Sequence, residues 1–334
     1  QYAPELFPYI KIKVDKEKQR GMYWLTGSQQ FELMKNVQES LAGRVGIVRL
    51  NSLTYSEITK NETKEIFRPS EFKETKNIGV NELFETIFKG GMPELYDIEN
   101  MNKNYYFDAY LNTYLSRDIK EYINVMDLND FKKFMVSVAS RTGEQLNYSS
   151  IASEIGISDK TARVWLDILV ASGIVYLLEP YMSSKIKRLT HMPKIIFMDT
   201  GLCSYLAGWE DARTLQLSSS AGHYLETFII SEIIKSYNAK GEEPNISYYR
   251  DKEKNEIDLI FYKNKKLYPF EIKKTAMPND TMIKTFYKLE DSGKEVAPGG
   301  IICFYDKLMH LDSKHYIIPI SSVINLSKDN LELI

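Results

Sequence analysis

Three charged residues interrupt two apolar runs near residue 260, and their types and spacing suggest chemistry. The run EIDLIFYK is joined to the run KLYPFEIKK by an Asn-Lys dipeptide. A two-residue loop between antiparallel strands pairs Lys263 with Lys266 and, counting back, Asp258 with Glu271. Lys273 follows on the same face. Facing carboxylates repel each other unless a cation lies between them, and oxygen ligands at this separation suit Mg²⁺ or Mn²⁺.

A further carboxylate lies on a helix predicted over residues 222–237. Apolar side chains recur there at helical spacing with Glu226 in their midst, whereas Glu232 and Lys235 are expected on the opposite side. A carboxylate in the middle of a buried face is costly unless it is paired or binds an ion. Glu226 therefore joins Asp258 and Glu271 as a candidate site residue.

A Glu on a first helix, an Asp on a strand and Glu-x-Lys on the next strand resemble the PD-(D/E)xK nuclease fold. The resemblance implies that Glu226, Asp258 and Glu271 bind the metal. It also implies that Lys273 helps to activate water and offsets charge that develops on the phosphate. These four residues are the predicted catalytic set, with Mg or Mn as the predicted cofactor.

A structural interpretation of the same residues stays open. Lys273 would then pair with Glu256 across the hairpin, Lys274 would point to solvent, and Glu226 would pair with His223. The charges would serve the fold rather than catalysis.

The elements that must position this site alternate between strands and helices from about residue 186 to the end. Strands are predicted at PKIIFMD, ISYYR, EIDLIFYK, KLYPFEIKK, GGIICFYD and HYIIPIS, and a second helix at NDTMIKTFYKLEDSG. This order is typical of an α/β unit.

Residues 131–183 have the element order of a winged helix-turn-helix. Three helices are predicted, the last over SDKTARVWLDILVASG with Ser158 as its cap, followed by a strand at IVYLLEPY. Lys160, Thr161 and Arg163 lie early in the third helix, where DNA contacts usually arise. Further basic residues follow the strand and are also predicted to contact nucleic acid, with DNA favoured: Lys185, Lys187 and Arg188. Packing of this unit against other protein surfaces alone is the alternative.

The N-terminal third carries weaker patterns. MYWLTGS at 22–28 and GIVRL at 46–50 are expected as strands, with a helix at 31–43 between them. The charged stretch 56–77 is expected as a linker or exposed helix. The following residues, to about 126, are expected as helix interrupted at Gly90-Gly91 and Pro93.

The bulk composition fits a protein with several compact units. The 334 residues are 43% hydrophobic and carry a net charge of −2, so no basic field covers the whole chain. Cys203 and Cys303 lie in unrelated contexts, which indicates a reducing compartment and no zinc site. No apolar run is long enough to span a membrane. We therefore expect a cytoplasmic protein without a membrane partner.

The whole chain resembles the prokaryotic AAA-type ATPases that carry a C-terminal domain of unknown function with a restriction-endonuclease-like fold. The resemblance covers nearly all of the chain and rests on LTGSQQF, SLAGR, GGMPE, YLSRDI, LNYSSIASEIGISDKTARVWLDIL, PKIIFMDTGL and EIDLIF…FEIKK. It implies that Ser28 or Gln29 is a sensor residue and that Arg44 is a candidate for contact with a nucleotide phosphate.

One departure from that family is large, because the sequence contains no G-x-x-x-x-G-K-[ST] motif. Its opening, QYAPELFPYIK, resembles the segment that follows the family's Walker B strand. We therefore expect a fragment that lacks both nucleotide motifs, and ATP binding only together with the missing half.

The predicted fold class is a multidomain α/β protein in three units. These are a remnant of a P-loop ATPase core with a linker at 1–75, a helical segment with the winged helix at 76–183, and a PD-(D/E)xK nuclease-like domain at 184–334. The predicted function is a metal-dependent DNA endonuclease coupled to an ATPase. The alternative is a non-cleaving, ATP-dependent switch whose winged helix contacts DNA or a protein; an oligomer is compatible with either.

Overall fold

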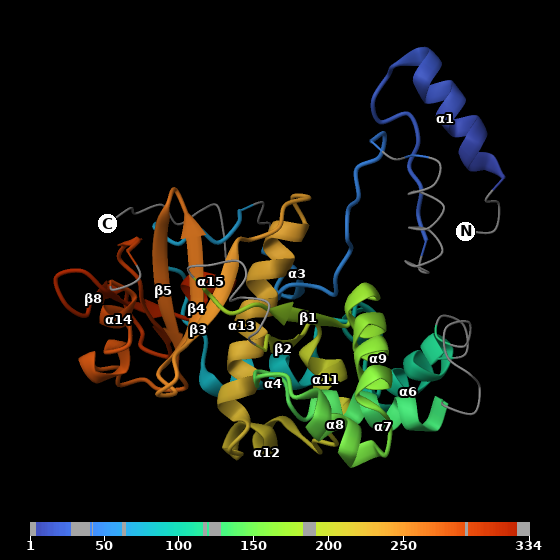
Figure 1. Ribbon diagram of the computed structural model, residues 1–334. Helices are drawn as coiled ribbons and strands as arrows, with labels where there is room; N and C mark the ends of the chain where they lie inside the picture. The colour runs from blue at the N-terminus through green and yellow to red at the C-terminus, as the bar shows by residue number, and fades with distance from the viewer. Residues whose placement is uncertain are drawn as a thin grey trace.

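The computed structural model describes residues 5–27, 41, 43–61, 65–115, 119, 128–182, 192–290 and 293–325. Figure 1 shows helix α1 (Leu6–Glu17) standing apart from the body that holds the other labelled elements. Phe7 and Leu41 form a small apolar cluster of their own with Ile10.

The strands predicted at 22–28 and 46–50 are wrong for the residues that the structure describes. Residues 22–27 and 46–50 contain no strand, and Trp24 and Leu50 are 90% and 94% exposed. A strand requires a hydrogen-bonded neighbour, and no described strand pairs with either segment. The helix expected at 31–43 lies almost entirely outside the described residues.

Short helices build the middle of the chain. They are α3 (Tyr55–Ile58), α4 (Val80–Lys89), α5 (Glu94–Asp97), α6 (Lys103–Tyr114), α7 (Leu128–Ala139), α8 (Tyr148–Ile155) and α9 (Asp159–Ala171). The predicted break after residue 89 is confirmed, because Gly90 adopts a φ of 77°. A Cβ at Gly90 would lie only 2.4 Å from Asp199 and 2.6 Å from Gly201, so this turn requires glycine.

The elements predicted over 131–183 are present. Ser158 caps α9 by accepting the backbone N–H of Thr161 at 3.0 Å, as predicted. Strand β1 (Val175–Leu178) follows α9 and pairs antiparallel with β2 (Lys194–Phe197). This small sheet joins strands from either side of the boundary expected at residue 183.

A mixed sheet forms the C-terminal part of the molecule. Its strands are β3 (Ile246–Arg250), β4 (Glu256–Lys263), β5 (Lys266–Ile272), β6 (Glu295–Val296), β7 (Gly300–Cys303), β8 (Met309–His310) and β9 (Tyr316–Pro319). The order is β3-β4-β5-β7-β9-β8, with β6 also paired to β5. β3, β4 and β5 are antiparallel, whereas β5, β7 and β9 are parallel.

The predicted register of the β4–β5 hairpin is confirmed. Lys263 pairs with Lys266 and Leu259 pairs with Phe270. Asn264 and Lys265 both have positive φ, at 52° and 65°. A two-residue turn of this hand matches the twist of the strands and fixes their register.

Helices cover both faces of the sheet (Figure 1). α13 (Ala221–Asn238) and α15 (Ser321–Ile324) share a core with Phe261 and Phe270, while the alternate residues Ile260 and Leu267 pack with η3 (Asp280–Ile283) and α14 (Phe286–Glu290). The single helix predicted at NDTMIKTFYKLEDSG is thus replaced by two short elements, η3 and α14. α11 (Thr200–Leu206) and α12 (Ala212–Leu217) connect β2 to α13.

Residues 56–77 were expected to form a linker or an exposed helix, and this expectation is wrong for their apolar residues. Phe67 is 1% exposed, and its ring lies 5.3 Å from that of Phe261 and 5.8 Å from that of Phe270. Phe72 lies 6.1 Å from Phe270. Two phenylalanines therefore anchor residues 65–75 on the sheet, which the charged composition concealed. The described structure is a mixed α/β fold, and none of its helices has the length and apolar character to cross a bilayer.

Candidate functional site

Helix α13 and the β4–β5 hairpin bring the predicted catalytic residues to one cluster, in which Glu226, Asp258 and Glu271 are buried and Lys273 is half-buried. Lys273 Nζ lies 2.9 Å from Asp258 Oδ2 and 2.5 Å from Glu271 Oε2. The backbone N–H of Ile272 donates to the same Asp258 oxygen at 2.8 Å. A cation therefore lies at both carboxylates of the hairpin, as their mutual repulsion requires.

A second lysine completes the cluster. Lys194, the first residue of β2, is 2% exposed, and its Nζ lies 2.6 Å from Glu226 Oε1 and 2.5 Å from Glu256 Oε1. Arg250 Nη1 lies 3.0 Å from the other carboxylate oxygen of Glu256. Lys194 was not predicted as a site residue, and its place at the head of the apolar run KIIF does not reveal the buried carboxylates that it contacts.

The environment separates the pKa values of the three carboxyl groups. Burial raises the pKa of Glu226 to about 7, with Lys194 opposing the shift and Asp258 adding to it. Burial and the charge of Asp258 raise the pKa of Glu271 well above its usual value. Burial opposes a low pKa at Asp258, but Lys273, Lys194 and the N–H of Ile272 together lower it. Asp258 is thus the residue of this set that remains ionised most readily.

The donor chemistry of the cluster suits a hard divalent ion, but its present arrangement does not. Four carboxylates from Glu226, Glu256, Asp258 and Glu271 each have an oxygen 2.5–2.9 Å from a lysine ammonium group. Within the described part of the chain, no group of three or more His, Cys, Asp or Glu residues is arranged to hold a metal ion. As folded, these residues do not fit a metal, because each carboxylate is already paired with a lysine ammonium group.

The structural interpretation predicted ion pairs whose partners differ from those observed. Lys273 pairs with Asp258 and Glu271 rather than with Glu256. His223 Nδ1 lies 3.5 Å from Glu144 Oε1, and Glu226 pairs with Lys194 instead. Lys274 does not simply point to solvent, because its ammonium group donates to the backbone oxygen of Gln216.

The outer side of α13 is also buried, which corrects the expectation for Glu232 and Lys235. Both are 4% exposed, and their charged groups lie 3.2 Å apart. Glu232 Oε2 accepts the backbone N–H of Tyr55 at 2.6 Å, and Lys235 Nζ donates to the Leu53 oxygen at 3.3 Å. The chain at 53–55 covers this side of the helix, a long-range contact that helical periodicity does not report.

Three of the residues predicted to contact DNA are described by the structure, and they lie at the start of α9. Lys160 and Arg163 are exposed, and the Arg163 guanidinium lies 4.1 Å from the centre of the Tyr148 ring. The Thr161 hydroxyl lies 2.8 Å from that of Ser158. Three further residues lie outside the described residues: Lys185, Lys187 and Arg188.

The predicted nucleotide-contacting residues are only partly visible. Ser28 and Gln29 lie outside the described residues. Arg44 forms a two-pronged ion pair with Asp15, with Nε–Oδ1 at 2.5 Å and Nη2–Oδ2 at 3.1 Å. Its proposed contact with phosphate remains a prediction.

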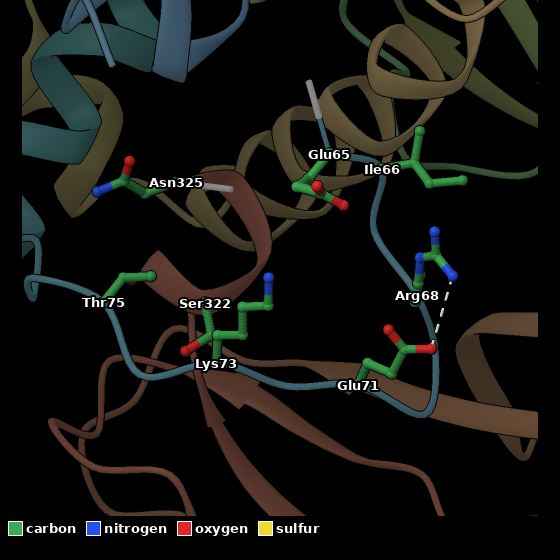
Figure 2. A pocket seen from close by; sticks show the side chains of 8 residues that line it. All are labelled: Glu65, Ile66, Arg68, Glu71, Lys73, Thr75, Ser322 and Asn325. Carbon is green, nitrogen blue, oxygen red and sulfur yellow. Dashed lines mark ion pairs between the residues drawn. The ribbon is translucent and has the colours of Figure 1, made fainter. Parts of the chain in front are cut away.

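A separate pocket lies between residues 65–75 and α15, and Figure 2 shows its lining. Its cavity of about 30 Å³ has room for about two water molecules. Among the residues that the structure describes, the buried hydroxyls of Thr75 and Ser322 have no hydrogen-bonding partner, while Arg68 and Glu71 pair at 3.7 Å. The remaining lining residues are Glu65, Ile66, Lys73 and Asn325. None of the predicted catalytic residues lines this pocket.

Comparisons with known proteins divide the chain into three matched parts. Residues 1–59 match an AAA domain, residues 80–213 match a domain of unknown function (DUF8612), and residues 221–323 match another (DUF4143). Lys194 thus lies in the second matched part, whereas its partners Glu226 and Glu256 lie in the third.

The chain is also similar to two curated mycobacterial proteins. The uncharacterized proteins Mb2031c of Mycobacterium bovis and Rv2008c of Mycobacterium tuberculosis are each 27% identical over 281 residues, which is 84% of this chain. The chain spans 58% of the length of each relative. A crystal structure of protein VC1899 from Vibrio cholerae is similar over 69% of this chain and 53% of that protein, at 17% identity and a TM-score of 0.20.

The TM-score of that structural likeness is too low to support an argument. The matches to known domains are the informative result. The matches at residues 1–59 and 221–323 together support the resemblance to an AAA-type ATPase family with a C-terminal domain of unknown function.

Proposed function

We propose that the C-terminal unit is a PD-(D/E)xK nuclease-like domain that acts on DNA within an ATP-binding protein. The observation that carries this proposal is the convergence of the buried carboxyl groups of Glu226, Asp258 and Glu271 from α13, β4 and β5, beside the half-buried Lys273. Buried charges with pKa values pushed in opposite directions are typical of functional sites.

Glu226, Asp258 and Glu271 are the proposed ligands for Mg or Mn, and Lys273 is the proposed catalytic cation. Since each of these carboxylates is paired with a lysine as folded, binding of the metal requires those ion pairs to rearrange. The sequence spacing and the register of the β4–β5 hairpin support this choice of residues.

DNA is the proposed partner of the α7–α9 unit. Its three helices and the β1–β2 sheet have the element order of a winged helix, and Lys160 and Arg163 are exposed at the start of α9. Lys185, Lys187 and Arg188, outside the described residues, add positive charge to the sequence that follows this unit. We place this activity in the cytoplasm because the sequence has few cysteines.

Calorimetric titration of Mn²⁺ tests the proposal directly. We expect weak binding to the chain that disappears in the Asp258→Ala, Glu271→Ala double variant, because that variant removes the facing carboxylates. Equal binding to both proteins would refute a metal site on the hairpin. Thermal unfolding of the double variant is the control for loss of fold.

The pairing of the site's carboxylates with lysines favours a second candidate, a non-cleaving switch that transmits the nucleotide state of the AAA domain. Its structural basis is the contact of Leu53 and Tyr55, within the AAA match, with Lys235 and Glu232 of α13. If DNA binds the chain with equal affinity in the wild type and the Asp258→Ala variant, and neither protein nicks it, the switch is the better account.

A further inference from the structure

Lys103, the first residue of α6, differs from three other lysines that the fold removes from water. Lys194, Lys235 and Lys273 each have their ammonium group within 3.2 Å of a carboxylate oxygen. Lys103 is half-buried, and no carboxylate among the described residues forms an ion pair with it. An ammonium group that loses water without gaining a carboxylate is destabilised relative to the neutral amine.

The side-chain nitrogen of Lys103 has two neighbours in place of a carboxylate. Its Nζ donates to Ser204 Oγ at 2.6 Å and lies 3.3 Å from the centre of the Phe88 ring. The Ser204 hydroxyl in turn donates to the backbone oxygen of Phe88 at 2.8 Å, so its oxygen accepts from Lys103. Both contacts of Nζ need only N–H groups. A neutral amine keeps two N–H groups for them and has its lone pair left for reaction.

Three packed helices hold this arrangement in place. α11, which carries Ser204, packs on α4 and α6, and all three helices lie in the match at residues 80–213 (Figure 1). A Cβ at Gly201 would lie 2.7 Å from the Cα of Gly90, so α11 meets the end of α4 backbone to backbone. Phe88 and Ser204 are therefore fixed relative to each other before Lys103 packs between them.

The titratable groups around Lys103 do not outweigh its burial. Asp199 favours the ammonium form. Its two oxygens, however, already accept the backbone N–H groups of Leu202 and Gly91. Burial raises the pKa of the Cys203 thiol to about 12, so this thiol is neutral near pH 7. Burial also lowers the pKa of Lys103 to about 7, which leaves much of this amine neutral where an ordinary lysine is almost wholly protonated.

We propose that Lys103 is a nucleophilic lysine that accepts an acyl group from a small acyl phosphate. The lone pair of the neutral Nζ attacks the carbonyl carbon, a C–N bond forms, and the C–O bond to the phosphate breaks. The phosphate leaves with the electron pair, the nitrogen releases one proton to solvent, and the product is an amide. Desolvation in apolar surroundings is a general means of activating a lysine for such attack.

A small donor suits a half-buried nitrogen that Phe88 covers on one side. The reaction replaces a positive charge at the junction of α4, α6 and α11 with a neutral amide. This site shares no residue with the carboxylate cluster, so the inference stands or falls independently of the proposed nuclease function.

The test is incubation of the chain with acetyl phosphate at about pH 7.5, with peptide mass spectrometry to follow the acetylation of each lysine over time. Lys160 is exposed and serves as the comparison. We expect Lys103 to react at least about tenfold faster than Lys160, because the larger neutral fraction of its amine outweighs its lower basicity. The rate at Lys103 should also level off above about pH 8, once its amine is neutral.

Phe88→Glu tests the surroundings of the amine, since it places a carboxylate beside Nζ and so stabilises the ammonium form. We expect Lys103 of this variant to react no faster than Lys160. Phe88→Leu is the matched control, because it removes the ring without adding a charge. In Phe88→Leu, Lys103 should keep an advantage over Lys160 of at least about tenfold.

Equal rates of acetylation at Lys103 and Lys160 in the wild type overturn the inference. Fast acetylation that persists in a folded Phe88→Glu variant also overturns it, because the apolar surroundings would then not be the cause. Circular dichroism checks the fold of each variant. If Phe88→Glu is unfolded, the pH profile of the wild type decides: a plateau at Lys103 supports the inference, and a rate that climbs in parallel with that of Lys160 overturns it.

Discussion

Burial of Glu226 raises the pKa of its carboxyl group to about 7, so its charge changes close to neutral pH. An acid with a higher pKa in the folded state binds more protons there than in the unfolded chain. The stability that this group contributes is therefore present below pH 4.5 and is lost as the pH rises through about 7. The loss is at most about 3 kcal/mol, from the size of the shift.

Glu226→Gln should remove this pH dependence, because glutamine does not ionise in this range. We expect the wild type to lose free energy of unfolding relative to the variant as the pH rises over that interval. Urea denaturation of both proteins across the interval measures the difference. Curves that stay parallel would show that Glu226 does not titrate with a raised pKa.

Individual charged residues of the site differed in how far the sequence could predict them. Asp258, Glu271 and Lys273 could be placed together because a two-residue turn fixes the register of adjacent strands. Lys194 could not, because its contacts with Glu226 and Glu256 join elements that are distant in sequence. A charge at the head of an apolar strand has the same local pattern whether it faces water or a buried carboxylate.

At the scale of elements, α13 is buried on both sides, and its outer side is held by the chain at 53–55. Removing one partner of a buried ion pair leaves the other charge uncompensated, which typically costs about 3–5 kcal/mol. We expect Glu232→Ala to lower the free energy of unfolding by about this amount, because it also removes the acceptor for the Tyr55 N–H. Chemical denaturation measures the loss.

Glu232→Gln is the control for that variant, since its amide oxygen can still accept from Tyr55. A smaller loss than in Glu232→Ala is expected. Equal losses would assign the whole effect to the charge of Glu232 and none to the contact with residues 53–55.

The cap of α9 gives a milder prediction. Ser158 accepts the N–H of Thr161, so Ser158→Ala should destabilise the protein by about 1 kcal/mol. Thermal or urea unfolding would show this, with Ser158→Asp, which retains a capping oxygen, close to the wild type. A loss in Ser158→Asp as large as in Ser158→Ala would argue against capping as the cause.

The elements show which sequence patterns carried enough information. Strands β3, β4 and β5 and helix α13 were predicted because each has a strong period or a continuous apolar run. The burial of residues 56–77 was not predicted, because their few apolar residues, among them Phe67 and Phe72, lie among charges without a regular period. Their burial depends on a sheet whose strands lie about two hundred residues further along the chain.

At the scale of the whole molecule, the match to an AAA domain covers residues 1–59 and the chain spans 58% of its curated relatives. Since the sequence contains no G-x-x-x-x-G-K-[ST] motif, we expect no saturable binding of ATP to this chain in a fluorescence titration with a labelled ATP analogue. Saturable binding that unlabelled ATP displaces would contradict this expectation. It would also reveal a nucleotide site that the sequence motifs do not predict.

The most direct test of the central claim is an assay of supercoiled plasmid cleavage by the chain with Mn²⁺, beside the Asp258→Ala variant. The account predicts nicking by the wild type that is abolished in the variant, because Asp258 is the carboxylate of the cluster with the lowered pKa. Nicking that persists unchanged in Asp258→Ala would contradict the assignment of nuclease activity to this cluster.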